Sequence, residues 1–259
     1  MMAESNPYRT QWDSYVQTWD RENVPNSSSS KLEWPGDEWA EEETWSRIFQ
    51  TMFLDFGAAD WKNCVEIGAG SGKYTDKVLR HSEAQIIAFD ISPAYLEVLT
   101  KRLAADVQAE RLYPVLLSGD DASEMLQELK RRRLIRKIDA LYSIDAMVHV
   151  DLQYLMAYFL TAALCLNKEG RLIMTLANAV SEAGFAALVQ DTKSYYPMQG
   201  EPSAKFEWLG PEMVQRVLER LGFSVQFIAP FNSVEQDRDL FVIATLVDID
   251  RAQSFQEAL

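Results

Sequence analysis

The chain has 259 residues, of which 47% are hydrophobic, and this is enough for a sizeable core in one globular domain with appendages. Its formal net charge of −14 at pH 7 opposes contact with the phosphates of nucleic acids, so we expect no nucleic-acid partner. The longest apolar runs have the length of strands, well short of the ~18–20 residues of a membrane span, and no secretory signal opens the sequence. A cytoplasmic protein with no membrane partner is therefore predicted.

Residues 1–57 form an aromatic and acidic segment that precedes the regular part of the sequence. Five of the seven tryptophans lie before residue 46. The acidic residues 41–43 favour the start of a helix because they complement the helix dipole, and this helix is expected to run to about Phe56. We expect the segment to be a helical extension of the main domain.

From Asn63 onward, apolar runs alternate with amphipathic segments. The runs predict strands, and the segments between them predict helices. The expected strands are residues 63–68, 85–90, 113–118, 138–144 and 170–177. The expected helices are residues 73–82, 93–106, 123–133 and 152–166. Such an alternation indicates an α/β fold with a parallel, doubly wound sheet.

The end of the sequence departs from this alternation. A helix is expected over residues 211–222, which a proline opens and a glycine closes. Two apolar runs follow, residues 223–229 and 239–247, and their connection is too short for a crossover helix. These two strands are therefore expected to pair as an antiparallel hairpin. The predicted sheet has seven strands and is mostly parallel, and residues 249–259 form a tail.

One basic cluster, residues 130–137, stands against the acidic composition. A local patch for nucleic acid is one interpretation, but no aromatic side chains are interleaved with the cations to stack on bases. We favour the C-terminal end of a surface helix, where cations complement the helix dipole. The two cysteines, Cys64 and Cys165, lie in apolar runs and are expected to be buried free thiols.

The stretch VEIGAGSGKYT, residues 65–75, places three glycines in a turn between a predicted strand and a predicted helix. A P-loop is rejected, because GxxxxGK[ST] requires Ser or Thr where Tyr74 stands and the glycine spacing is one residue short. A dinucleotide fingerprint, GxGxx[GA], is disfavoured, because the third glycine, Gly72, comes one position early and Lys73 takes its place. A nucleotide-dependent oxidoreductase, which such a fingerprint would imply, remains an alternative.

The pattern that fits the turn is E-x-G-x-G-x-G, made by Glu66, Gly68, Gly70 and Gly72. With it, the sequence over about residues 63–247 resembles the class I S-adenosylmethionine-dependent methyltransferases, and the terminal antiparallel hairpin belongs to the same resemblance. The resemblance implies S-adenosylmethionine as cofactor and S-adenosylhomocysteine as product. It places the turn, with Glu66 and Ala69, beneath the methionine part of the cofactor, where a Cβ at Gly68 or Gly70 would obstruct the ligand.

The ends of the next strands supply further candidate cofactor residues. Asp90 ends the second strand, where a carboxylate can accept hydrogen bonds from both ribose hydroxyls, although NAD enzymes use an acid similarly. Asp120 and Asp121 follow the third strand; one of them is expected to accept from the adenine amino group and the other to cap the next helix. By the same resemblance, the cofactor site also includes Ile91, Ser143 and Trp39.

The end of the fourth strand, YSIDAMVHVD (residues 142–151), is expected to lie beside the transferable methyl group. Amino methyltransferases of DNA carry [DNS]PP[YFW] there, and this sequence does not. Methyl transfer requires an aligned nucleophile and the exclusion of water, and a hydroxyl nucleophile also requires a base. His149 is the first candidate for the base, and Asp145 is an alternative base or substrate anchor. A metal-dependent O-methyltransferase would need Asp145 and Asn178 to converge with further ligands, and we expect no metal.

The resemblance to small-molecule members of the family implies a lid over the substrate. Residues 1–57 and an insert at residues 178–208 would form it, the insert lying within a methyltransferase domain that spans residues 58–248. We therefore expect transfer of a methyl group to an oxygen or nitrogen of a small molecule. The alternatives are the oxidoreductase and a non-catalytic module that binds S-adenosylmethionine. The sequence does not indicate an oligomeric state.

Overall fold

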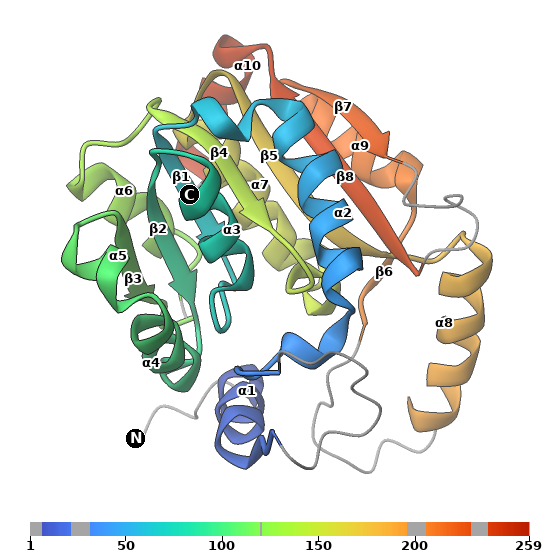
Figure 1. Ribbon diagram of the computed structural model, residues 1–259. Coiled ribbons are helices and arrows are strands. Elements are labelled where there is room, and N and C mark those ends of the chain that lie inside the picture. The colour runs from blue at the N-terminus through green and yellow to red at the C-terminus, as the bar shows by residue number, and fades with distance from the viewer. Residues whose placement is uncertain (1–6, 22–31, 120, 196–205, 229–237, 259) are drawn as a thin grey trace, which may run out of the picture. The chain divides into compact units, whose positions relative to one another are not determined.

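The computed structural model describes residues 7–21, 32–119, 121–195, 206–228 and 238–258, and Figure 1 shows its helices and strands. The chain divides into two compact units, residues 1–120 and residues 121–259. The first unit contains the N-terminal extension and the first three strands, and the second unit contains the remaining strands.

The first unit is built on three parallel strands in the order β3-β2-β1. These are β1 (Asn63–Ile67), β2 (Gln85–Asp90) and β3 (Leu112–Leu116). The connecting helices are α3 (Lys73–His81), α4 (Pro93–Arg102) and α5 (Ala104–Gln108). The helix predicted over residues 93–106 is thus interrupted at Leu103, whose φ of −114° and ψ of 33° are not helical.

Local sequence determines where these helices begin. Gly72 takes the left-handed conformation (φ 86°) directly before α3. Pro93 lies in the first turn of α4, and the hydroxyl of Ser92 accepts a hydrogen bond from the backbone N–H of Tyr95, as an N-cap does. Every residue of β2 except its first is buried, as is usual for a parallel strand covered on both faces.

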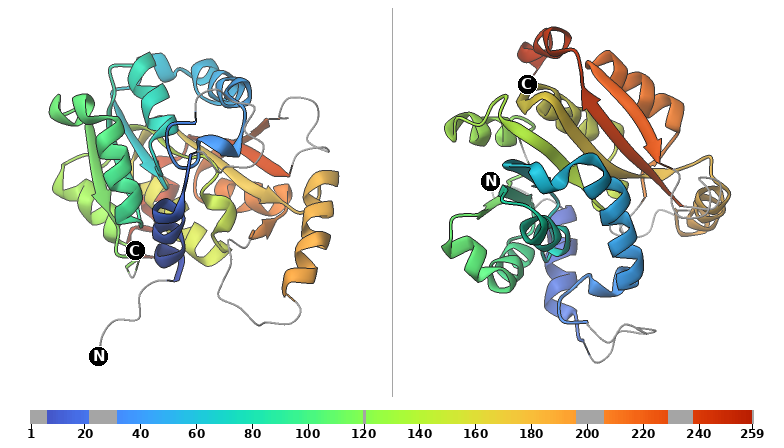
Figure 2. Two further views of the ribbon diagram at one scale, coloured as in Figure 1. Left: turned by 60° about the horizontal axis from the view of Figure 1, so that its bottom comes forward. Right: turned by 45° about the horizontal axis from the view of Figure 1, so that its top comes forward.

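The N-terminal extension is helical, as predicted. Its elements are α1 (Pro7–Thr18), η1 (Asp37–Trp39), α2 (Glu42–Met52) and η2 (Leu54–Phe56), and η3 (Ala58–Asp60) follows it directly before β1. α1 lies against α4, as the left view of Figure 2 shows. α2 buries a stripe of side chains at helical spacing, Trp45, Ile48, Phe49 and Met52. The helix predicted to run to about Phe56 is in fact two helices, since α2 ends at Met52 and η2 ends at Phe56.

The second unit has the strand order β4-β5-β8-β7, with β6 paired to β5. Its strands are β4 (Ile138–Ser143), β5 (Leu166–Asn178), β6 (Trp208–Leu209), β7 (Phe223–Ile228) and β8 (Asp239–Leu246). β4 runs parallel to β5, whereas β8 runs antiparallel to both β5 and β7. The predicted terminal antiparallel hairpin is therefore confirmed. The two-residue β6 was not predicted, since so short a strand carries no periodicity.

The helices of the second unit are α6 (Glu124–Arg131), η4 (Met147–His149), α7 (Leu152–Cys165), α8 (Glu182–Tyr195), α9 (Pro211–Arg220), α10 (Ile249–Gln253) and η5 (Gln256–Ala258). Asp151 is the N-cap of α7 and accepts hydrogen bonds from the backbone N–H groups of Gln153 and Tyr154. Residues 159–165 of α7 are all buried, because the helix is apolar around its whole circumference. α8 follows the carboxyl end of β5, as Figure 1 shows.

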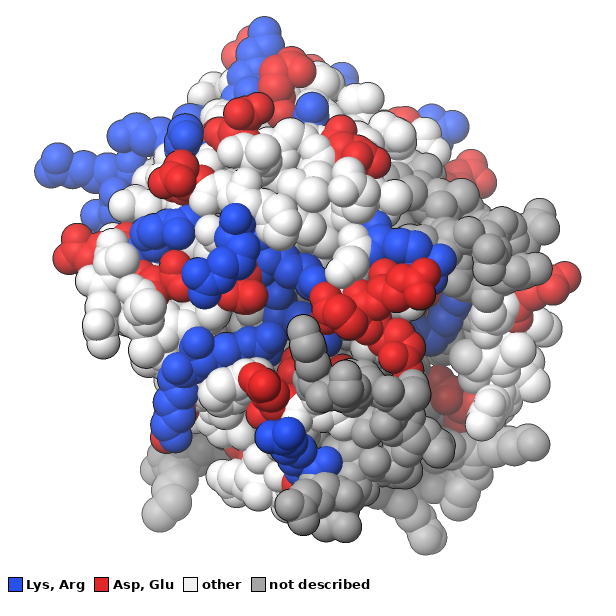
Figure 3. Space-filling model, in the orientation of Figure 1, with Lys and Arg blue, Asp and Glu red and all other residues white. Residues whose placement is uncertain are grey.

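The basic cluster at residues 130–137 is the end of α6 and the turn that follows it, as predicted. Arg131 and Arg132 both form ion pairs with Glu128, at 2.5 and 2.6 Å. Arg136 donates to the backbone carbonyl of Ala163 near the end of α7. Three cations of this cluster, Arg131, Arg132 and Arg136, are therefore engaged within the second unit. On the face shown in Figure 3, acidic and basic side chains are interspersed.

The cysteines and the lengths of the helices are the last features of the fold. Cys64 and Cys165 are buried and not disulfide-bonded, as predicted. Burial raises the pKa of the Cys165 thiol to about 12, which keeps it protonated and unreactive near neutral pH. Within the described residues, none of the helices is long and apolar enough to cross a membrane.

Candidate functional site

The glycine turn between β1 and α3 has left-handed backbone at all three of its glycines: φ is 66° at Gly68, 52° at Gly70 and 86° at Gly72. A Cβ at Gly72 would lie 3.1 to 3.2 Å from Leu103 and Leu99, so this glycine also allows α3 and α4 to pack closely. A Cβ at Gly70 would meet no protein atom nearer than 3.7 Å. The ring of Tyr95 thus lies at ordinary contact distance from the position of such a Cβ, beside the turn where the sequence predicts the ligand.

Glu66 and Ala69 fix the turn to its surroundings. The carboxylate of Glu66 is buried and accepts a 2.5 Å hydrogen bond from the hydroxyl of Thr75 in α3. The backbone N–H of Gly68, and more weakly that of Ala69, donates to the carbonyl of Phe89 in β2, at 2.8 and 3.3 Å. These contacts connect the end of β1 to β2 and to α3, and they hold the glycine turn in one position.

Asp90, at the end of β2, is joined to the same turn. Its Oδ2 accepts a 2.8 Å hydrogen bond from the N–H of Gly70, and its Oδ1 accepts one of 2.8 Å from the N–H of Ser92. Burial raises the pKa of Asp90 to about 6; these N–H donors oppose the rise, and the charge of Asp13 adds to it. The backbone N–H of Ile91 also acts on this carboxylate, which has about four acceptor sites, so Asp90 keeps the capacity to accept a further hydrogen bond.

Two side chains of α1, which the sequence did not identify, contact the ends of the neighbouring strands. The guanidinium of Arg9 donates to the carbonyl of Ile91 (2.8 Å) and to the carbonyls of Leu117 (2.7 Å) and Ser118 (2.6 Å). Asp13 accepts from the hydroxyl of Ser92 at 2.5 Å. α1 thus covers the carboxyl ends of β2 and β3, which include the predicted cofactor residue Ile91. An isolated Arg and Asp in a short helix carry no motif that could have revealed this.

An aromatic group extends from α1 to η1. Trp39, 44% exposed, packs its ring against Trp12 and Tyr15, with centroids 6.3 and 5.8 Å away. Tyr15 also stacks on Tyr95 of α4, at 6.2 Å between centroids. Glu38 accepts hydrogen bonds from the indole N–H of Trp19 (3.0 Å) and from the hydroxyl of Tyr15. The predicted site residue Trp39 therefore belongs to a layer of rings whose far edge is Tyr95, the side chain nearest to Gly70.

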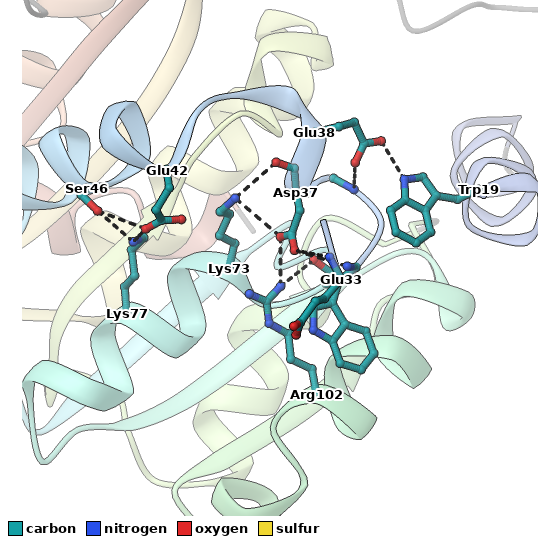
Figure 4. A network of polar contacts seen from close by, with 12 residues as sticks. Trp19, Glu33, Asp37, Glu38, Glu42, Ser46, Lys73, Lys77 and Arg102 are labelled. Atoms are coloured by element: carbon teal, nitrogen blue, oxygen red, sulfur yellow. Dashed lines mark hydrogen bonds and ion pairs between the residues drawn. The ribbon is translucent and has the colours of Figure 1, made fainter. Parts of the chain in front are cut away.

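A network of charges surrounds Asp37, as Figure 4 shows. Asp37 is only 5% exposed and lies 3.5 Å from the ammonium of Lys73 and 3.3 Å from the guanidinium of Arg102. The Arg102 guanidinium also contacts the hydroxyl of Ser71 in the glycine turn, at 3.3 Å. Burial lowers the pKa of Lys73, and the nearby charge of Arg102 contributes, against the opposing effect of acidic neighbours. Two half-buried cations thus share one carboxylate at the start of α3.

Of the two acidic residues after β3, Asp121 lies within the described residues and Asp120 does not. Asp121 accepts from the backbone N–H and the hydroxyl of Ser123, at 2.8 and 2.7 Å, and these hydrogen bonds lower its pKa. Asp121 therefore bonds to Ser123, the N-cap residue of α6, whose own side chain makes no capping hydrogen bond. Asp120 lies outside the described residues, and the predicted contact of Asp120 or Asp121 with adenine stays a prediction.

In the second unit, the end of β4 supplies Ser143 and Asp145. The hydroxyl of Ser143 is fully buried and has no hydrogen-bond partner in the described part of the chain. Asp145 takes the left-handed conformation (φ 59°), and its N–H donates to the hydroxyl of Thr175 in β5 at 2.7 Å. A non-glycine residue rarely adopts this conformation, and such residues are frequent at functional sites.

The carboxylate of Asp145 faces Arg238, which precedes β8. Arg238 donates to Oδ1 of Asp145 at 3.1 Å and to both carboxylate oxygens of Asp239, at 2.6 and 2.7 Å. Burial raises the pKa of Asp145 to about 6; the charge of Asp239 adds to this, and Arg238 opposes it. Two carboxylates therefore share one guanidinium.

His149, at the end of η4, meets the same group through Phe206. The rings of His149 and Phe206 have centroids 4.9 Å apart, and Trp208 lies 5.5 Å from Phe206. The guanidinium carbon of Arg238 lies 4.4 Å from the centroid of the Phe206 ring. The structure thus brings His149 and Asp145 into one neighbourhood, connected by Phe206 and Arg238. In the described residues no group of three His, Cys, Asp or Glu side chains could hold a metal ion.

Comparisons with known proteins show which solved structures have a similar fold. No family model matches the sequence, and no curated protein matches it. Among solved structures, magnesium protoporphyrin IX methyltransferase from Synechocystis PCC 6803, with bound SAH, is similar at 16% identity over 78% of this chain and 82% of that one, with a TM-score of 0.55. Phosphoethanolamine N-methyltransferase 2 of Haemonchus contortus is similar at 13% identity over 79% of this chain and 52% of that one, with a TM-score of 0.55.

A third similar structure is that of the pyocyanin biosynthetic protein PhzM, at 18% identity over 79% of this chain and 54% of that one, with a TM-score of 0.54. The chain spans about half the length of this protein and of the Haemonchus enzyme. At identities this low, the likeness concerns the path of the backbone. The chain therefore has the fold of the S-adenosylmethionine-dependent methyltransferases, as its glycine turn and terminal hairpin predicted.

Proposed function

We propose that this protein transfers a methyl group from S-adenosylmethionine to an oxygen or nitrogen of a small molecule, releasing S-adenosylhomocysteine. One observation carries the proposal: Gly70, in the left-handed glycine turn, and Asp90 are joined by a hydrogen bond at the end of a parallel strand. Ligands of α/β sheets bind beyond the carboxyl ends of the strands. A nucleoside there can place its ribose hydroxyls on Asp90 and its amino-acid part over the glycine turn.

The charges near the turn can also receive the amino-acid part of the cofactor. S-adenosylmethionine carries one carboxylate at its methionine end. In the described residues Lys73 and Arg102 share the carboxylate of Asp37, and the contact between Lys73 and Asp37 is long, at 3.5 Å. A half-buried ammonium with so weak a partner gains from a second carboxylate. We assign the cofactor carboxylate to Lys73, at the first residue of α3.

Calorimetric titration with S-adenosylhomocysteine and with methylthioadenosine tests this assignment. The second ligand has the same nucleoside but no amino-acid part. In the Lys73→Met variant we expect the affinity for S-adenosylhomocysteine to fall about 10-fold, the loss of one charge-assisted hydrogen bond, while methylthioadenosine binds unchanged. Lys77→Met is the matched control, because it removes an ammonium one turn further along α3 that pairs with Glu42 at 2.6 Å. Equal losses of affinity for the two ligands in Lys73→Met would refute the carboxylate contact. If the unmodified protein bound neither ligand, S-adenosylmethionine would not be its cofactor.

The remaining parts of the proposal concern the acceptor side and the cover. Residues 1–57 and 178–208 are proposed to exclude water from the reaction as a lid on a methyltransferase domain of residues 58–248, in a protein of the cytoplasm. His149 is the first candidate for the base, and Asp145 is an alternative base or substrate anchor. Turnover assayed with a radiolabelled methyl group separates this enzyme from a non-catalytic module, and fluorescence enhancement of NADH on mixing would instead support the oxidoreductase.

A further inference from the structure

The acid–aromatic cluster of the second unit offers a specific chemistry for the acceptor. We use this name for Asp145, His149, Phe206, Arg238 and Asp239. Its members come from the segment after β4, from the segment before β6 and from the start of β8. Since β8 is antiparallel to β5, its first residues lie at the carboxyl end of β5, and Asp239 pairs with Ala177 there. This edge of a parallel sheet is where α/β proteins bind ligands.

The cluster has more negative than positive charge. Its two carboxylates share Arg238, which commits Nε and one terminal nitrogen to Asp239 and uses the same terminal nitrogen for Asp145. In the described residues, Oδ2 of Asp145 has no hydrogen-bond partner. The side chain of Asp145 is 25% exposed, so part of it is open to solvent. The raised pKa of Asp145, caused by burial and by the charge of Asp239, reflects a carboxylate whose charge is incompletely balanced.

The aromatic side of the cluster already accommodates a cation. Arg238 lies over the ring of Phe206, and His149 and Trp208 flank that ring. The face of an aromatic ring attracts a cation electrostatically, which an aliphatic side chain does not do. Arg238 itself thus shows that a cation in this cluster meets a carboxylate on one side and a ring face on the other.

We propose that the acid–aromatic cluster binds an amine in its ammonium form and that the amine nitrogen is the methyl acceptor, an inference that rests on the proposed function. A carboxylate ligand would face two carboxylates and a guanidinium that is already bonded to both of them. A neutral alcohol would gain a hydrogen bond at Asp145 but no charge attraction. Of the acceptors that an oxygen or nitrogen methyltransferase can use, the ammonium gains most from these neighbours.

The reaction at such a site balances without any further reactant. The bound ammonium gives one proton to the carboxylate of Asp145, which leaves a neutral amine with a free electron pair. This pair forms the new N–C bond as the C–S bond of the sulfonium breaks, and the electrons of that bond remain on sulfur in S-adenosylhomocysteine. The methylated product is again an ammonium, and Asp145 passes its proton to solvent. Asp145 thus both orients the nitrogen and removes the proton that blocks attack.

A matched trio of ligands tests the inference: phenethylamine, phenethyl alcohol and hydrocinnamate differ mainly in an amine, a hydroxyl or a carboxylate at the end of the same chain. Each is titrated by calorimetry into the full-length protein, with and without saturating S-adenosylhomocysteine. We expect the amine to bind at least about 10-fold more tightly than the other two. Mass spectrometry after incubation with S-adenosylmethionine should detect N-methylphenethylamine.

Two variants locate the effect. Asp145→Asn should weaken the amine about 10-fold and leave the alcohol unchanged, because only the charge attraction is lost. Asp139→Asn is the matched control: it makes the same change near the other end of β4, where the carboxylate accepts from Asn167 at 2.7 Å, and should change neither ligand. Tighter binding of hydrocinnamate, failure of phenethylamine to bind, or equal loss of amine and alcohol in Asp145→Asn would each overturn the amine site. Loss of nucleoside binding with intact discrimination of amines would overturn the proposed function instead.

Discussion

Asp90 and Asp145 end two strands in different units, and burial raises the pKa of each to about 6. Their partners differ. Asp90 is held by two backbone N–H groups, from Gly70 and Ser92. Asp145 is held by one side chain, the guanidinium of Arg238, which it shares with Asp239. We call the backbone N–H groups that hold Asp90 the backbone cradle. The same raised pKa thus arises for Asp90 in the backbone cradle and for Asp145 among side chains.

This difference matters for what each carboxylate can do. Backbone donors at a turn with three left-handed glycines cannot rearrange without refolding the turn, so Asp90 is preorganised for one kind of ligand. The side-chain partners of Asp145 can rotate, and a ligand can replace or extend them. A cofactor common to many enzymes suits the first arrangement, and an acceptor particular to one enzyme suits the second. Four predictions test this distinction.

The pH dependence of stability tests whether Asp90 is as buried as its position implies. Its pKa rises from 3.8 in the unfolded chain to about 6 in the folded protein, so between these values the folded protein binds more protons than the unfolded chain. The free energy of unfolding should therefore fall as the pH rises from about 4 to about 6, by about 3 kcal/mol from this group. Urea unfolding across this range measures the fall, and Asp90→Asn should flatten it. An unchanged slope would show that Asp90 is solvated.

Nucleoside binding tests the backbone cradle directly. In Asp90→Asn one amide N–H₂ must face the N–H of Gly70 or Ser92, so the cradle is lost together with one acceptor for the ribose. We expect the affinity for S-adenosylhomocysteine to fall about 30-fold, that is by about 2 kcal/mol. Asp76→Asn is the control, because its carboxylate pairs with Arg80 on the surface of α3. Equal affinities of the two variants would remove Asp90 from the cofactor site.

The backbone cradle was largely predictable from the sequence. The glycine spacing, the acid at the end of β2 and the alternation of strands and helices are all local patterns, and the terminal hairpin followed from the short connection between two apolar runs. The structure confirms these elements and departs from them only where local signals are weak. The two-residue β6 and the interruption of the helix at Leu103 are the clearest such cases.

The side-chain partners were not predictable from the sequence. Arg9 donates to Ile91, 82 positions along the chain, and Arg238 contacts Asp145 across 93 positions. Neither arginine stands in a motif, and no local propensity joins residues so far apart. Asp37 likewise looked like one acid in an acidic segment until the fold placed Lys73 and Arg102 beside it. Tertiary structure alone creates these pairs.

Removal of Arg238 tests the side-chain partners of Asp145. Arg238 opposes the rise in the pKa of Asp145, so Arg238→Met should move this pKa further upward and leave that of Asp90 unchanged. Titration of the aspartate carboxyl carbons by NMR reads both groups in one experiment. Arg216→Met, which removes an exposed arginine paired with Glu219, serves as the control. If the pKa of Asp145 stayed constant, the guanidinium would not be its main counter-charge.

The smallest expected effect concerns α1. The charge of Asp13 contributes to the raised pKa of Asp90 and is the weakest of its causes, so Asp13→Asn should lower the pKa of Asp90 slightly. The amide oxygen of an Asn can still accept from the hydroxyl of Ser92 and from the N–H of Ala94, so α1 should stay docked. The same NMR titration measures the shift, and hydrogen exchange of α1 checks the docking. A lower pKa with unchanged exchange would show that α1 acts on Asp90 through charge. An unchanged pKa would mean that the backbone cradle and burial alone set the protonation of Asp90, which would make the contrast with Asp145 complete.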